Sequence, residues 1–205
     1  YLVAAAQEVG RRPRVVYAST ATVYGLTNDF PVSEDAPTEP ITNYDLHKLF
    51  AEHQLKLASK HGILDGVSLR LANVYGPSSS ASSADDRGIL NKITRLALQG
   101  VDLHLYGDGN YLRDYVYIDD VVRAFIAGGV TRGLGGRVFN VASGKGITVR
   151  EVFHLIAELA ARHTGKRISI HSVPWPDSSD PIELRNFFAD TTSFYNATGW
   201  QSIID

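Results

Sequence analysis

The order of hydrophobic and polar positions along the chain predicts strands and helices in alternation. Residues 1–10 carry apolar side chains on one side of a helix that a glycine ends. Residues 14–20 (RVVYAST) form a short apolar run, which is typical of a buried strand. Residues 42–62 predict a long helix, and residues 66–77 (GVSLRLANVYGP) predict the next strand. A strand, a helix and a strand of these lengths form a βαβ unit, so we expect a parallel sheet.

The second half of the chain shows the same alternation with shorter elements. Residues 88–100 predict a helix, and residues 116–130 predict a strand that continues into a helix. Residues 138–165 repeat that scheme. Within them Thr148 and Glu151 form a T-x-x-E capping box ahead of an apolar helical run. We interpret this pair as structural, because it lies where a helix should begin.

The composition excludes several classes of function. The chain has 205 residues, is 44% hydrophobic and 20% charged, and carries a formal net charge of -2. This is an ordinary globular composition, and the absence of a basic stripe argues against a nucleic-acid partner. No apolar stretch approaches the roughly 18 residues of a membrane span, so we expect no membrane partner. Cysteine is absent, which excludes thiolate chemistry and agrees with a reducing, cytoplasmic location. We expect no metal site.

Two residues of the long predicted helix could carry acid–base chemistry. Tyr44 and Lys48 are four residues apart, so their side chains share a face of the helix. An ammonium group beside a phenol favours the phenolate, which would make the tyrosine a usable general base. By itself, however, the pair is more typical of a solvated helix face. Its interpretation depends on what the neighbouring strands supply.

Hydroxyl groups gather where the first predicted strand ends, in residues 18–25 (ASTATVYG). Ligands of parallel sheets bind at the carboxyl ends of the strands. A tyrosine base needs a nearby hydroxyl that orients the substrate alcohol, and this stretch offers one beside the helix. Asn73 lies at the end of the next strand, and therefore at the same edge. An ordinary polar turn is the alternative interpretation.

Four motifs in order carry a resemblance to a known family. They are YASTATVYG, YDLHK, LRLANVYGP and GDGNYLRDYVYIDDV. Together they resemble the extended short-chain dehydrogenase/reductase family, and within it the NAD-dependent nucleotide-sugar epimerases and dehydratases. The likeness continues to ADTTSFYNATGW near the end of the chain. It implies an α/β fold: the C-terminal half of a Rossmann-type, doubly wound parallel sheet, plus a smaller α/β lobe that binds the substrate.

The resemblance also implies a domain division and a departure from the family. Residues 1–77 would belong to the NAD-binding domain and residues 78–205 to the sugar-nucleotide lobe, with residues 114–142 returning to the sheet. The polar loop at 78–86 would mark the boundary. Family members open with a glycine-rich strand–turn–helix that cradles the NAD pyrophosphate. This sequence has no such turn, because the glycines at 128–136 connect a helix to a strand. We therefore expect the N-terminal part to be missing.

The resemblance assigns roles to particular residues. Tyr44 would be the base, Lys48 would hold the nicotinamide ribose, and Thr20 would bond the substrate oxygen, so the implied catalytic residues are Thr20, Tyr44 and Lys48. The implied cofactor-binding residues are Ala18, Ser19, Tyr44, Lys48, Leu71 and Ala72. The implied substrate-binding residues are Thr20, Asn73, Leu90, Tyr106, Arg113 and Glu183. Arg113 would pair with a phosphate, and Tyr106 would stack near the nucleotide base.

Two positions depart from the pattern of some relatives. Relatives often carry an arginine where this chain has Asp180, and an aspartate cannot hold a phosphate, although Arg185 could substitute from a shifted register. Dehydratases follow the catalytic threonine with an acidic pair, whereas this chain has Ala21 and Thr22. Alanine cannot move a proton. The stretch instead resembles the S-S-A-T-V-Y-G of UDP-glucose 4-epimerases, with threonine in place of the catalytic serine.

We therefore expect an NAD-dependent epimerase that acts on a nucleotide-diphosphate sugar, at C4, through a transient keto sugar. NADP is the less expected cofactor. A ketosugar reductase and a 4,6-dehydratase of the same family remain as alternatives, as does a non-catalytic dinucleotide-sensing protein on this fold. Relatives often dimerise through the helix that carries the Y-x-x-x-K pair, and the mixed apolar surface of residues 44–60 allows a homodimer.

Overall fold

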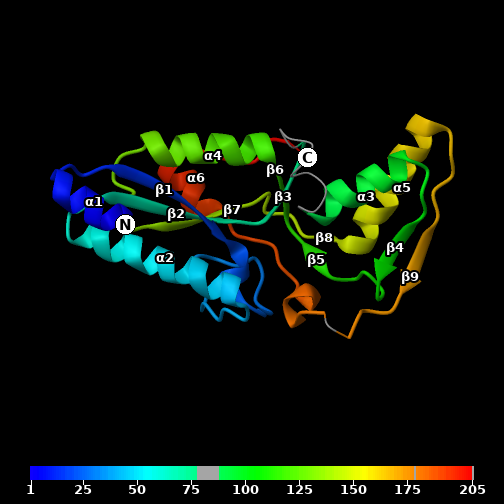
Figure 1. Ribbon diagram of the computed structural model, residues 1–205. Coiled ribbons are helices and arrows are strands. Elements are labelled where there is room, and N and C mark those ends of the chain that lie inside the picture. Colours follow the sequence, from blue (N-terminus) through cyan, green and yellow to red (C-terminus); the bar gives the residue numbers. More distant parts are fainter. Residues whose placement is uncertain (78–87, 178, 205) are drawn as a thin grey trace.

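A parallel three-stranded sheet forms the centre of one of the two lobes (Figure 1). The computed structural model describes residues 1–77, 88–177 and 179–204. The strands are β1 (Arg14–Thr20), β2 (Asp65–Leu71) and β7 (Val138–Val141), in the order β1-β2-β7. The middle of β2 is buried on both faces, as expected for a strand covered by helices on each side. The predicted α/β class and parallel sheet are confirmed.

Helices cover both faces of this sheet. Helix α2 (Asn43–Lys60) lies on one face, and helices α4 (Ile118–Val130) and α6 (Thr192–Thr198) lie on the other (Figure 1). Phe139 of β7 packs against Phe194 of α6, and Trp200 joins the same apolar cluster. The C-terminal segment therefore returns to the sheet, in addition to the return predicted for residues 114–142. Helix α1 (Leu2–Val9) ends at a glycine, as predicted.

The strand predicted at 66–77 is divided in two by the structure. It begins at Asp65 and ends at Leu71, and a separate strand β3 (Asn73–Tyr75) pairs with β6 (Tyr115–Tyr117). Backbone hydrogen bonds explain the break: the N–H of Ala72 donates to Val141, whereas the N–H of Asn73 donates to Asp114. The chain thus changes its pairing partner after Leu71. This change brings Asn73 and residues 113–117 to the carboxyl edge of the sheet.

The second lobe has its own apolar core. Helices α3 (Ile89–Leu98) and α5 (Val149–Thr164) pack on each other and on the parallel pair β4 (Leu103–Tyr106) and β9 (Ile170–Val173). Strands β5 (Leu112–Arg113) and β8 (Ile147–Thr148) pair antiparallel near the junction with the sheet (Figure 1).

The capping box predicted for this lobe is confirmed: Thr148 and Glu151 exchange hydrogen bonds at the start of α5. The boundary predicted at 78–86 lies outside the described residues. Within the described part of the chain, no helix is long and apolar enough to cross a membrane.

Candidate active site

The end of β1 turns sharply into a short 3-10 helix, η1 (Ala21–Tyr24). Thr20 caps this helix, because its side-chain oxygen accepts a hydrogen bond from the N–H of Thr22. Gly25 ends it with φ 66°, and a Cβ there would lie 2.2 Å from the carbonyl oxygen of Glu39. The tight turn therefore fixes where the buried hydroxyl of Thr20 lies.

Helix α2 begins beside this turn. A capping box starts it, in which Thr42 and Asp45 exchange hydrogen bonds. On the face toward the sheet, Lys48 Nζ donates to the carbonyl oxygen of Ala18 over 2.8 Å. The same ammonium lies 5.5 Å from the centre of the Tyr44 ring. Tyr44 is 57% exposed, so its ring is open to a ligand. The structure thus brings the Y-x-x-x-K pair to the end of β1.

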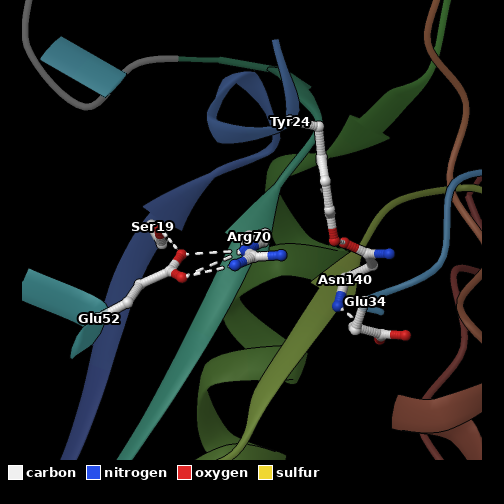
Figure 2. Close-up of polar contacts among 6 residues, drawn as sticks. All are labelled: Ser19, Tyr24, Glu34, Glu52, Arg70 and Asn140. Carbon is white, nitrogen blue, oxygen red and sulfur yellow. Dashed lines mark hydrogen bonds and ion pairs between the residues drawn. The ribbon is translucent and has the colours of Figure 1, made fainter. Parts of the chain in front are cut away.

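One turn further along α2, Glu52 ties the helix to two strands (Figure 2). Its carboxylate accepts hydrogen bonds from Ser19 of β1 and from Nε and Nη2 of Arg70 of β2. The Nη2–Oε2 distance is 2.8 Å, and the side chains of Arg70 and Glu52 are only 6% and 1% exposed. Burial lowers the pKa of Arg70, but the hydrogen bonds and charge of Glu52 outweigh it, so the pKa is raised.

The hydroxyl of Ser19 therefore donates inside the protein, and a contact of this residue with the cofactor stays a prediction. Glu52 and Arg70 are not among the residues predicted from the sequence. One signal was present, because residues 44, 48 and 52 continue a single stripe along the helix. Arg70 offered no such signal, since only the register of β1 and β2 places it opposite Ser19.

The same polar network extends to the third strand. The Arg70 guanidinium lies 4.6 Å from the centre of the Tyr24 ring. The Tyr24 hydroxyl donates to Oδ1 of Asn140 over 2.7 Å, and the Asn140 N–H donates to Oε1 of Glu34 over 2.8 Å (Figure 2). Burial raises the pKa of Tyr24 and of Glu34. The network fixes α2, and with it Tyr44, relative to all three strands of the sheet.

Two arginine side chains meet near η2 (Pro181–Leu184). Arg113 of β5 donates to the carbonyl oxygens of Leu112, Glu183 and Arg185. Burial lowers the pKa of Arg113. Burial, followed by the charge of Arg113, lowers the pKa of Arg185 to about 10. Within the described residues neither guanidinium forms an ion pair. Together they make a positive site that a phosphate group would fit.

Two buried polar atoms at this arginine pair have no partner in the described part of the chain: Nε of Arg185 and the hydroxyl of Tyr115. Unused polar atoms beside two cations also suit an anionic ligand. Arg185 therefore lies next to Arg113, and its substitution for the arginine of some relatives stays a prediction. Asp180 instead caps η2, because its carboxylate accepts a hydrogen bond from the N–H of Ile182.

The other predicted substrate residues are distributed over the junction and the second lobe. The Asn73 side chain donates to the carbonyl oxygen of Asp114 over 3.1 Å. Leu90 and Tyr115 line a cavity of about 980 Å³ between α3 and α5. Tyr106 stacks on Trp175, with ring centres 5.1 Å apart. Its outer face remains available, because Tyr106 is 42% exposed.

For a dinucleotide, the described residues supply one end of a site. Lys48 and the open ring of Tyr44 lie beside the carboxyl end of β1, where Leu71 ends the neighbouring strand and Ala72 follows it. These residues fit the nicotinamide end of the cofactor, whereas the glycine-rich turn for its pyrophosphate is not in the sequence. No cluster of three or more histidine or acidic side chains suited to a metal occurs among residues that the structure describes.

Comparison with known proteins identifies the family. The model of the NAD dependent epimerase/dehydratase family matches residues 1–142. The chain belongs to this family. Among relatives in the family, a UDP-glucose 4-epimerase from Mycolicibacterium smegmatis is 32% identical over 202 residues, which cover 98% of this chain and 60% of that protein. A dTDP-glucose 4,6-dehydratase from Streptomyces griseus is 28% identical over 193 residues, covering 93% of this chain and 54% of that protein.

A solved structure of the family is also similar. The crystal structure of UDP-glucose 4-epimerase from Thermotoga maritima with UDP-glucose has a TM-score of 0.86 and 30% identity, and the match covers 100% of this chain and 62% of that chain. The chain therefore spans 54% to 62% of the length of these three epimerase/dehydratase relatives.

Proposed function

We propose that this protein catalyses the NAD-dependent epimerisation of a nucleotide-diphosphate sugar at C4, through a transient keto sugar. The observation that carries the proposal is the position of Tyr44 beside Lys48, whose ammonium donates to Ala18, two residues before Thr20 at the carboxyl end of β1. A phenol, an ammonium and a hydroxyl at one strand end suit the removal of a proton from a sugar alcohol. When bound, NAD supplies the acceptor for the hydride and returns it.

In this proposal each residue has one task. Tyr44 takes the proton of the sugar hydroxyl, and Lys48 holds the nicotinamide ribose. Thr20 bonds the sugar oxygen. Arg113 and Arg185 bind the diphosphate, whose charge would offset the burial that lowers the pKa of both guanidinium groups. Because the arginines lie at the junction of the two lobes, the diphosphate would direct the sugar toward the strand end.

The residues after Thr20 favour an epimerase over a 4,6-dehydratase. Elimination of water requires an acid and a base at the sugar, and Ala21 supplies neither. The relatives named UDP-glucose 4-epimerase support UDP-glucose as the first substrate to test. A ketosugar reductase would use the same three residues, but it would consume a reduced cofactor in each cycle.

Two further proposals concern the state of the protein. We propose a homodimer that forms through α2, because Leu46, Phe50 and Leu57 of this helix are 51%, 61% and 57% exposed. Light scattering that shows a monomer at micromolar concentration would contradict the dimer. We also propose a cytoplasmic location, on the absence of cysteine.

One incubation tests the proposed reaction. The complete protein that carries these residues is mixed with UDP-glucose and no added reductant, and products are separated by chromatography. We expect UDP-galactose to appear with no net formation of NADH. Stoichiometric consumption of NADH or NADPH would instead indicate a reductase. A 4-keto-6-deoxy sugar would indicate a dehydratase and would contradict the interpretation of Ala21.

A further inference from the structure

A chain of hydrogen bonds leads from Thr20 into the protein interior. Oγ1 of Thr20 and Oγ1 of Thr22 are 2.9 Å apart, and the Thr22 hydroxyl donates to Oδ1 of Asp45. Asp45 is only 1% exposed and lies in the first turn of α2, next to Tyr44. These hydrogen bonds therefore join the end of β1, η1 and helix α2.

The direction of these hydrogen bonds follows from the partners of Asp45. The N–H and the hydroxyl of Thr42 donate to Oδ2, over 3.2 Å and 2.7 Å, while Thr22 donates to Oδ1. A carboxylate that receives three donors is an acceptor only. The positive charge of Arg185 is also within electrostatic range. Because the single hydroxyl hydrogen of Thr22 is given to Asp45, the hydrogen between the two threonines belongs to Thr20.

Helix capping does not account for all of this arrangement. The capping box uses Oδ2 of Asp45, and the hydrogen bonds that this oxygen accepts from described residues come from Thr42. Oδ1 is left for Thr22, a residue of another element. The structure thus links a buried carboxylate, through the hydroxyl of Thr22, to the hydroxyl of Thr20, which is the group proposed to meet the sugar.

We propose that Thr22 and Asp45 form a proton path that begins at Thr20, so that Asp45 is a second acceptor, besides Tyr44, for the one proton that the sugar hydroxyl releases in each turnover. This inference rests on the proposed function. Thr20 directs its own hydrogen to Thr22 and therefore offers the sugar only its oxygen lone pairs. A sugar hydroxyl that meets Thr20 must donate to it.

Protons and electrons balance when the sugar alcohol is oxidised by this path. The sugar O–H bond breaks and a new O–H bond forms on Thr20, whose former proton passes to Thr22, while the proton of Thr22 passes to Asp45. The electron pair of the adjacent C–H bond leaves with its hydrogen as hydride, for which the nicotinamide cofactor is the acceptor. The sugar carbon becomes a carbonyl, and Thr20 now donates a hydrogen bond to its oxygen. Return of the hydride reverses every transfer.

Two substitutions of Thr22 in the complete protein test the path. Thr22→Val removes the hydroxyl at similar volume, and Thr22→Ser is the matched control that keeps it. We expect Thr22→Val to lower kcat for UDP-glucose by about tenfold or more, with KM changed by less than about threefold. Thr22→Ser should restore kcat to within about threefold of the natural protein.

The same substitutions in a Tyr44→Phe background isolate the path. We expect Tyr44→Phe to keep measurable turnover, and the added Thr22→Val to lower it by a further factor of about ten or more, whereas Thr22→Ser does not. Absence of turnover in Tyr44→Phe, or equal turnover with valine and serine at position 22, would overturn the inference.

A second measurement does not depend on activity. Neutron diffraction locates the deuterium atoms of the hydroxyl groups, and we expect the one on Thr20 to point at Thr22 and the one on Thr22 to point at Asp45. The opposite orientation would overturn the inference. A natural protein that converts no nucleotide sugar would contradict the proposed function alone, and the deuterium positions would still decide the direction of the hydrogen-bond chain.

Discussion

Replacement of Glu52 by glutamine keeps the shape of the side chain and removes one charge from a buried pair. The carboxylate contacts Nε and Nη2 of Arg70 and the hydroxyl of Ser19, and its side chain is 1% exposed. The amide of glutamine carries two N–H donors, so it cannot accept all of these hydrogen bonds. The positive charge of Arg70 then stays buried without its ion-pair partner.

The size of the effect follows from this burial. Removal of one partner of a buried ion pair costs about 3–5 kcal/mol. We expect Glu52→Gln to lower the free energy of unfolding by that amount, which is a large part of the roughly 5–15 kcal/mol of a typical domain. Urea unfolding at pH 7, followed by tryptophan fluorescence, measures the difference.

Two further variants make the result decisive. Glu158 pairs with Arg162 on the surface of α5, where the side chains are 58% and 72% exposed, so Glu158→Gln should cost only about 0.3–0.5 kcal/mol. Glu52→Leu combined with Arg70→Met leaves no buried charge and should recover most of the stability lost in Glu52→Gln. A loss below about 1 kcal/mol in Glu52→Gln, or a double variant as unstable as the single one, would refute the reasoning.

Three other predictions concern separate parts of the structure. Burial raises the pKa of Glu34, so the folded state is less stable once the pH has risen through that pKa and the side chain is charged. In urea titrations, Glu34→Gln should therefore stabilise the protein at about pH 8 and hardly at about pH 4. The reverse order would contradict this prediction. Gly25→Ala should lower the melting temperature more than Gly62→Ala. Both glycines have positive φ, which costs alanine about 1–2 kcal/mol. Of these two positions, only position 25 would also bring the Cβ to 2.2 Å from a backbone oxygen, which adds about 1–3 kcal/mol. Because burial lowers the pKa of Arg185 to about 10, Arg185→Met should raise the stability of the ligand-free protein at pH 7 and weaken UDP binding by about tenfold or more in calorimetry; unchanged UDP affinity would contradict the diphosphate site.

The elements of the fold could be predicted because their signals are local. The apolar run at 14–20 and the helical periodicity at 42–62 each depend on neighbouring residues, and both elements are present as β1 and α2. The break after Leu71 could not be predicted in this way. It depends on Asp114, more than forty residues away, whose carbonyl oxygen accepts the N–H of Asn73.

The residues of the candidate site likewise fall into those that could be predicted from the sequence and those that could not. Tyr44 and Lys48 could be predicted as a pair, because helical spacing alone puts their side chains on one face. The residues that hold helix α2 in place, and with it Tyr44 and Lys48, could not be predicted. The ion pair of Glu52 and Arg70 depends on how α2 lies across two strands, and the contact of Thr22 with Asp45 depends on how η1 meets the start of that helix. Contacts between elements leave no periodic signal in the sequence.

The fate of the hydrogen at C4 of the sugar tests the central claim most directly. UDP-glucose that carries deuterium at C4 is incubated with the complete protein and unlabelled NAD, and the product is analysed by mass spectrometry and NMR. We predict UDP-galactose that retains the deuterium at C4, because the hydride leaves and returns within the same site. Loss of the deuterium to the solvent, or its transfer to another carbon of the sugar, would contradict epimerisation at C4.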